Sequence, residues 1–198
     1  VFVSQGEARV SVPAGTYSAI SDDFVEGKTE DSGSLSITTV NEYDVTGAGQ
    51  TLTLDHRTAT VTPAVRGPKP ATPTSLYLEW DRVDAEDSVG FGSGYFVTPG
   101  LDVTIAPSGP ARVGTLAVLQ SWTLAESAAE PAAVYSLASL DDHVPTQPHS
   151  FRAGDLAKIT STYDGDGSGA VGGFSRSPVF TESGAGGIID RVARRSEE

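Results

Sequence analysis

The chain has 198 residues, a formal net charge of −13, and neither cysteine nor methionine. The lack of cysteine excludes disulfides, thiolate zinc sites and a cysteine nucleophile. The acidity disfavours nucleic acid as a partner, because phosphates need a basic surface, and no apolar run is long enough for membrane insertion. Because it lacks Met and opens on a strand-like sequence, the chain is expected to be an internal fragment.

The first third of the sequence predicts short antiparallel strands. Glu7–Val12 alternates apolar or small residues with polar ones, and Thr16–Ile20 runs back after the turn residues Pro13–Gly15. The acidic, glycine-bearing stretch Val25–Ser32 is predicted as a loop. Three β-branched or alternating segments are then predicted as strands: Ser34–Val45, Gln50–Asp55 and Arg57–Val65.

A proline-rich stretch divides the sequence. Residues 66–74 hold three prolines and a glycine, which indicate a linker between a first module (1–65) and a second module (75–198). The same stretch also fits a long crossover within one sandwich. Beyond it, eight further strands are predicted: Ser75–Val83, Gly94–Thr98, Leu101–Ile105, Val113–Thr123, Val134–Leu140, Asp155–Tyr163, Pro178–Thr181 and Gly187–Val192.

This pattern predicts an all-β fold of two antiparallel β-sandwich modules with little helix. In the strand Ser75–Val83, Leu76, Leu78 and Trp80 fall on one face, with Tyr77 and Glu79 on the other. Trp80 and Trp122 are in register with apolar positions and are predicted to lie in the core. The alternative is a sugar-stacking platform formed by both tryptophans with Tyr77 and Tyr95.

The glycine-rich stretch near the C-terminus is the one candidate metal site. Asp164, Asp166 and Ser168 occupy the first, third and fifth positions of a calcium loop, but its twelfth position is Ser175 rather than a bidentate acid. A hairpin tip with solvated acids explains the same residues. We therefore expect no bound cofactor, with calcium at this loop as the alternative.

No set of residues predicts catalysis. The stretch Gly92-Ser93-Gly94 resembles a strand of chymotrypsin-like peptidases, but no histidine follows at the required place. Asp31-Ser32-Gly33 matches the aspartate motif of subtilisin-like peptidases without the companion histidine and serine motifs. His56, His143 and His149 are interpreted as solvated loop histidines. We therefore predict no catalytic residue here.

Two stretches resemble a known family. The first is Ala8–Ala19 (ARVSVPAGTYSA) followed by Thr51–Thr60 (TLTLDHRTAT), and the second runs from Tyr135–Ala138 through Val144-Pro145 and Gly154–Ala157 to Tyr163. They resemble the non-catalytic C-terminal region of large secreted, actinobacterial subtilisin-like (S8 family) serine peptidases. His56 stands where that family usually has alanine.

The resemblance implies that the first module is a prealbumin-like or carboxypeptidase-regulatory-like sandwich, truncated at its N-terminus. It also implies an extracellular parent endopeptidase whose Ser-His-Asp triad lies upstream, and no catalytic residue of the family maps onto this sequence. The expected partners are the catalytic domain of the same chain and a protein substrate. The alternatives are a free-standing binding module for a glycan or cell-surface protein, and a calcium-stabilised adhesin spacer.

Overall fold

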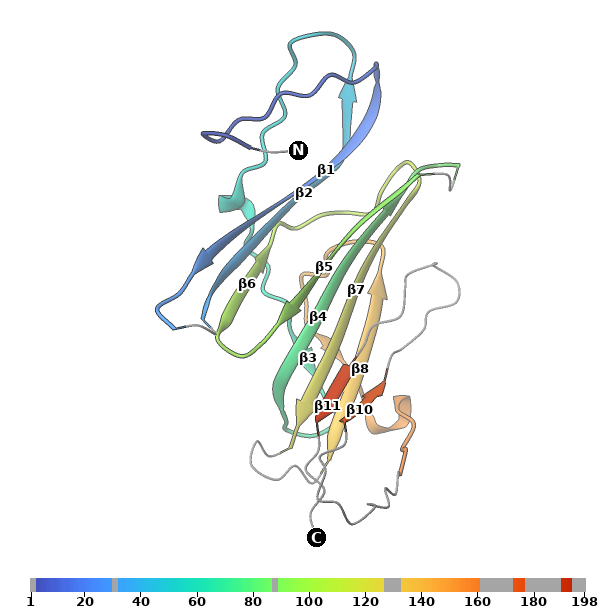
Figure 1. The fold of residues 1–198 in the computed structure, drawn as a ribbon. Coiled ribbons are helices and arrows are strands. Elements are labelled where there is room, and N and C mark those ends of the chain that lie inside the picture. Colours follow the sequence, from blue (N-terminus) through green and yellow to red (C-terminus); the bar gives the residue numbers. More distant parts are fainter. Residues whose placement is uncertain are drawn as a thin grey trace.

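The structure is a computed structural model that describes residues 3–29, 32–86, 89–126, 133–160, 173–176 and 190–193, the last two ranges by their backbone alone. Its described elements are strands and two short 3-10 turns, so the predicted all-β class is confirmed. Figure 1 shows a three-stranded sheet beside a longer four-stranded one. Within the described ranges, no helix has the length and apolar character needed to cross a membrane.

The three-stranded sheet has the order β1-β2-β6. Strand β1 (Gly15–Glu26) pairs antiparallel with β2 (Gly33–Val45) along its whole length, with a register shift between Tyr17 and Ala19. The predicted N-terminal hairpin is therefore wrong. The predicted loop Val25–Ser32 starts two residues later than expected, because β1 continues to Glu26, and its described residues 27–29 and 32 lie between the strands. β2 offers β1 a β-branched partner of similar length, which provides a longer ladder than residues 7–12 do.

Residues 51–64 form no regular strand, contrary to the prediction. His56–Thr58 is a 3-10 turn (η1), and the Asp55 side chain accepts a 3.0 Å hydrogen bond from Arg57 N. The same carboxylate forms a 2.7 Å ion pair with the Arg57 guanidinium. These local bonds compete with strand pairing, as aspartate side chains commonly do. Only Val61 joins the sheet, through an isolated bridge to Ile105.

The four-stranded sheet agrees closely with the predicted strands. Its order is β5-β4-β7-β8 and all its pairs are antiparallel. The bounds are β5 Gly90–Val97, β4 Thr72–Val83, β7 Thr115–Ala125 and β8 Val134–Asp141. The predicted strand Leu101–Ile105 is β6 with the same bounds, but it runs parallel to β2. The three-stranded sheet is therefore mixed rather than purely antiparallel.

Both sheets bury side chains in one hydrophobic core. Ile37 of β2 and Leu78 of β4 are fully buried, and each such side chain contributes roughly 1.5–3 kcal/mol when it is removed from water. The alternation of β4 is as predicted, with Leu76, Leu78 and Trp80 all inside. The core cluster comprises Leu35, Ile37, Leu76, Leu78, Trp80, Val97, Val103, Ile105, Leu116, Val118, Trp122, Leu124, Leu137 and Val144.

The proline-rich stretch is tied to the fold at both ends. Val65–Arg66 (β3) pairs in parallel with His149–Ser150 (β9), and β4 already begins at Thr72. Strands from both sides of residues 66–74 share the β1-β2-β6 sheet and the core cluster. Two separate cores are thus not visible in the described residues, a result that matches the crossover alternative.

The remaining elements follow β9 along the chain. Ala153–Asp155 forms a second 3-10 turn (η2), where a strand from Asp155 was predicted. Gly173–Arg176 (β10) pairs antiparallel with Asp190–Ala193 (β11), and the latter overlaps the end of a predicted strand. The predicted strand Pro178–Thr181 lies outside the described residues.

Candidate functional site

A serine and a histidine meet on the outer face of the three-stranded sheet. Ser21 Oγ on β1 lies 3.1 Å from Nε2 of His56 in the η1 turn, and the contact is partly buried. The pairing of Ser21 with Thr38 places both residues on the sheet face opposite to Ile37. A hydroxyl held by an imidazole is the first requirement of a serine nucleophile. Sequence reasoning did not predict this pair, because it depends on the long β1–β2 hairpin.

The second requirement, a carboxylate that orients the imidazole, is not met. His56 Nδ1 is buried without a hydrogen-bond partner in the described part of the chain. The adjacent carboxylate, Asp55, is bound to Arg57 instead, and these hydrogen bonds lower the pKa of Asp55 to about 2. The Thr38 hydroxyl on the same sheet face is also buried without a partner there. The arrangement is a dyad that lacks its orienting acid.

The other two histidines each contact an aspartate. His149 Nε2 lies 3.0 Å from Asp141 Oδ2, and both side chains are largely buried. His143 Nδ1 lies 2.7 Å from Asp142 on an exposed surface. His143 is therefore a partly exposed loop histidine, as predicted, whereas His149 lies in β9 and is not the solvated loop histidine that the sequence predicted. No group of three or more potential metal-ligating acids and histidines occurs among the described residues.

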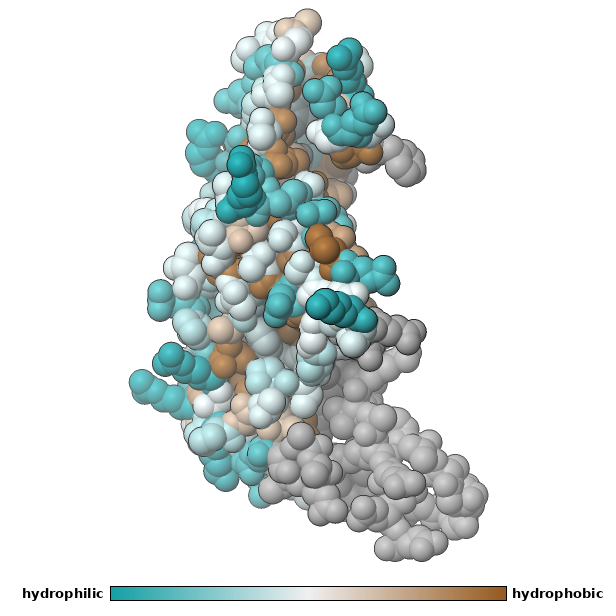
Figure 2. Space-filling view, turned by 90° about the vertical axis from the view of Figure 1, so that its left-hand side faces the viewer, coloured by the Kyte–Doolittle hydropathy of each residue, from teal (hydrophilic) through white to brown (hydrophobic). Residues whose placement is uncertain are grey.

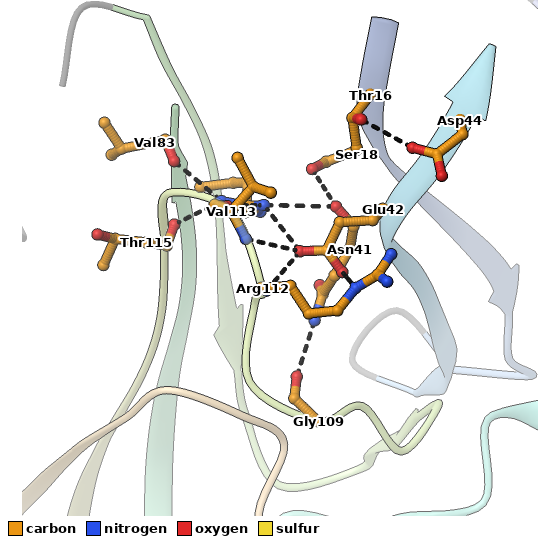
Figure 3. Close-up of polar contacts among 11 residues, drawn as sticks. Thr16, Ser18, Asn41, Glu42, Asp44, Val83, Gly109, Arg112, Val113 and Thr115 are labelled. Carbon is orange, nitrogen blue, oxygen red and sulfur yellow. Dashed lines mark hydrogen bonds and ion pairs between the residues drawn. The ribbon is translucent and has the colours of Figure 1, made fainter. Parts of the chain in front are cut away.

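A buried ion pair connects the two sheets. Arg82 of β4 reaches Glu42 of β2 at 3.3 Å, with side-chain exposures of 12% and 8%. Glu42 also accepts a 2.7 Å hydrogen bond from Arg112 N. Its carboxylate forms a longer ion pair, 3.6 Å, with the Arg112 guanidinium. Figure 3 shows these bonds converging from β2 and from the segment that leads into β7. We call Glu42, Arg82 and Arg112 the inter-sheet clamp.

The clamp leaves little capacity for a ligand. Besides Glu42, the Arg82 guanidinium donates to the carbonyl oxygens of Val113 (2.5 Å), Val83 (2.9 Å) and Thr115 (3.1 Å). Gly114, at φ +68°, allows this close approach, since a Cβ there would collide with the Val83 carbonyl. Both terminal nitrogens of this guanidinium have acceptors within the fold, and only Nε is buried without a partner in the described residues, so Arg82 holds structure together.

An acidic and aromatic face lies on the outer side of the four-stranded sheet. Tyr77, Glu79 and Asp81 of β4 point there, and Tyr77 contacts Phe96 of β5 with ring centroids 4.7 Å apart. Phe96 is 70% exposed. Burial and the Asp81 carboxylate raise the pKa of Glu79, and burial raises the pKa of Asp81. We call these four residues the acidic–aromatic face.

The tryptophans do not contribute to any such face. Trp80 is 3% exposed and Trp122 7% exposed, and both belong to the core cluster. Tyr77 lies on the opposite side of β4 from Trp80. The predicted core position of both tryptophans is confirmed, and the sugar-stacking platform that requires them outside is wrong.

One shallow depression is lined by the consecutive residues 65–71, so one segment forms it alone. On the face in Figure 2, hydrophobic residues form small separate areas among polar ones. Gly92-Ser93-Gly94 lies within β5, as strand rather than as part of a catalytic loop. The calcium candidates Asp164, Asp166 and Ser168 lie outside the described residues, as does Asp31.

Comparison with known proteins adds no assignment to this geometry. No protein-family model, curated protein or solved structure matches the chain.

Proposed function

We propose that this chain is a non-catalytic accessory β-sandwich region of a secreted subtilisin-like serine endopeptidase. In this proposal its two sheets form a β-sandwich with a prealbumin-like first part, and they brace the catalytic domain of the same protein or contact its protein substrate. The triad would be encoded elsewhere in the parent protein, which would act outside the cell. The proposal rests on the sequence resemblance together with the geometry of the chain's own serine–histidine pair.

The observation that carries the non-catalytic part of the proposal is the state of His56. Its Nε2 contacts Ser21, but its Nδ1 is buried and unpartnered in the described residues. Without an acceptor at Nδ1, nothing holds the tautomer or stabilises the imidazolium that must form as serine attacks. The Asp55 carboxylate, the nearest candidate along the chain, is committed to Arg57.

The motifs behind the resemblance serve the framework in this structure. Within Tyr135–Ala138, Leu137 is 1% exposed, and Val144 of the next motif is 2% exposed. Thr51–Thr60 holds the η1 turn that covers β2. Residues that pack a core or cover a sheet are what a shared accessory fold requires, and they favour a supporting role.

The test is a peptide-hydrolysis assay on this chain with a broad mixture of fluorogenic substrates. We expect the same release rate as from the Ser21→Ala variant, which serves as the matched control for contaminating proteases. Turnover that a serine-directed inhibitor blocks, and that Ser21→Ala abolishes, would refute the non-catalytic role. For the peptidase connection, a His-Gly-Thr and a Gly-Thr-Ser motif upstream in the same reading frame would support it, and their absence would remove it.

A free-standing extracellular binding module is the second candidate, and one observation favours a protein rather than a glycan as its ligand. Phe96 is exposed beside two carboxyl groups, whereas both tryptophans are buried. A glycan array is therefore expected to remain silent. Signal on the array that disappears in a Tyr77→Ala variant of unchanged melting temperature would reverse that preference.

A further inference from the structure

Strand β5 is an open sheet edge without the usual protection. Among the described residues it pairs only with β4. Its sequence, GFGSGYFV, has no charged residue and no proline, which are the devices that natural edge strands use against pairing. Gly92, Gly94 and Phe96 are all exposed on the outer side. The backbone groups along this edge are thus available to an additional strand.

The two glycines bring the acidic–aromatic face to this edge. Gly92 pairs with Asp81 and Gly94 with Glu79, so all four share one side of the sheet. A Cβ on Gly92 would collide with the Asp81 carboxylate, and a Cβ on Gly94 with the Tyr77 hydroxyl. The Asp81 and Tyr77 side chains therefore lie across β5 over its bare backbone. Their polar ends point toward the open edge instead of staying above β4.

The carboxyl groups lack a cation. Within the described ranges, neither Glu79 nor Asp81 forms an ion pair with an arginine, lysine or histidine. On the β7 side the neighbour of Glu79 is Leu119, an apolar side chain that is 1% exposed. Burial without a counter-charge disfavours the ionised form, which agrees with the raised pKa of both groups.

We propose that the β5 edge binds an extended, arginine-bearing segment of another protein, which adds to the sheet as a fifth strand. An arginine of the added strand, opposite Gly92 or Gly94, needs to cross only one strand spacing of about 4.8 Å to reach the Asp81 carboxylate. There the guanidinium finds carboxyl oxygens, and a second arginine further along the added strand, opposite Phe96, meets that exposed ring. This inference rests on the described edge alone and is independent of the peptidase connection.

Charge decides between this partner and a second copy of the chain. Edge-to-edge pairing of two β5 strands would bring two sets of Glu79 and Asp81 to one sheet surface, on proteins that each carry a net charge of −13. Like charges at an interface oppose association. A basic segment supplies the missing counter-charge and uses the same backbone groups, so the observations favour it.

The test measures binding of a fluorescein-labelled octapeptide that alternates arginine and valine, by fluorescence anisotropy. Three matched peptides serve as controls: one replaces arginine by citrulline, and two carry N-methyl groups on alternate amides, one in each phase. We expect the citrulline peptide to bind about tenfold more weakly, since hydrogen bonds to charged groups are the stronger ones. N-methylation of the amides that face β5 is expected to abolish binding, whereas N-methylation of the amides that face away is expected to leave binding unchanged. Strand addition requires this difference, because only alternate amides bond to the neighbouring strand.

The protein variants locate the site. Glu79→Gln combined with Asp81→Asn should weaken binding about tenfold, while Asp23→Asn combined with Asp102→Asn, which removes the same charge from exposed positions of β1 and β6, should change it less than about twofold. Unchanged melting temperatures exclude misfolding as the cause. Equal losses from both pairs, or indifference to both phases of N-methylation, would overturn the proposal. So would self-association of the free protein that Phe96→Lys abolishes, because the occupant would then be a second copy.

Discussion

Two glutamates on central strands of this fold have opposite surroundings. Glu42 is 8% exposed and lies among donors: the Arg82 guanidinium, the Arg112 guanidinium and the Arg112 backbone N–H. Glu79 is also partly buried, but its nearest charged neighbour is another acid, Asp81, and burial raises its pKa. Glu42 is paired with cations of the chain, whereas Glu79 has hydrogen bonds to Tyr77 and Asp81 but no cation among the described residues.

The difference shows which buried acid has its counter-charge within the chain and which has none in the described part of it. Removing a buried charge from its partner is costly, so the inter-sheet clamp holds β2 and β4 in one arrangement. In the acidic–aromatic face no cation of the described chain offsets the two carboxyl groups, and two neighbouring acids in a partly buried place repel each other. Such a pair is understandable if a partner supplies the cation.

Arg82→Met is expected to cause the largest loss. It leaves the Glu42 carboxylate buried without its main counter-charge and removes the donors to four carbonyl groups. The free energy of unfolding should fall by about 3–5 kcal/mol, measured by urea denaturation. A loss below about 1 kcal/mol would mean that the clamp does not hold the sheets together.

Glu79→Gln combined with Asp81→Asn is expected to act in the opposite direction. The folded-state pKa of both acids is raised, so they favour the fold at low pH and lose that contribution as pH rises through the folded pKa values. The variant should therefore be more stable than wild type at pH 7, by a few tenths to about 1 kcal/mol, because the site is partly solvated.

The pH dependence provides the control for that variant. Its advantage should disappear toward pH 3, where both acids are protonated in the folded and the unfolded chain. Asp55, whose pKa is lowered to about 2 by Arg57, loses its contribution as pH falls toward 2, but it is common to both proteins and cancels. An advantage that grows on acidification would contradict the repulsion between Glu79 and Asp81.

Arg112→Ala is expected to have the smallest effect. Its side chain is 73% exposed and its ion pair to Glu42 is 3.6 Å long, while the stronger 2.7 Å bond comes from its backbone N–H and survives the substitution. The unfolding free energy should fall by less than about 1 kcal/mol. A loss as large as that of Arg82→Met would show that the clamp is a three-residue network in which each charge is indispensable.

Much of the four-stranded sheet could be predicted from the sequence, because its pattern is local. Leu76, Leu78 and Trp80 alternate with polar residues, and only a half-buried strand explains that period of two. The three-stranded sheet was harder to predict from the sequence. Its register depends on which distant strand β1 finds, and the turn Pro13–Gly15 signals a hairpin that β2 outcompetes.

The sites depend even more on tertiary contacts. Glu42 and Arg82 lie forty residues apart, and nothing in either neighbourhood marks them as partners. The Ser21–His56 contact likewise needs η1 to cover β2, whereas residues 51–65 read as strands. The acidic–aromatic face did have a signal: Tyr77, Glu79 and Asp81 share the period of β4 on the side opposite to its core residues. The position of the β5 glycines opposite Asp81 and Glu79 could not be predicted, because it follows from the β4–β5 register.

The central claim is that the fold satisfies Glu42 internally and leaves Glu79 and Asp81 for a partner's cation. The most direct test is NMR titration of the side-chain carboxyl carbons of Glu79 and Asp81, alone and saturated with the arginine–valine octapeptide. We predict that saturation lowers the pKa of both groups, since an adjacent guanidinium favours the ionised form. Unchanged pKa values with the peptide fully bound would contradict the claim.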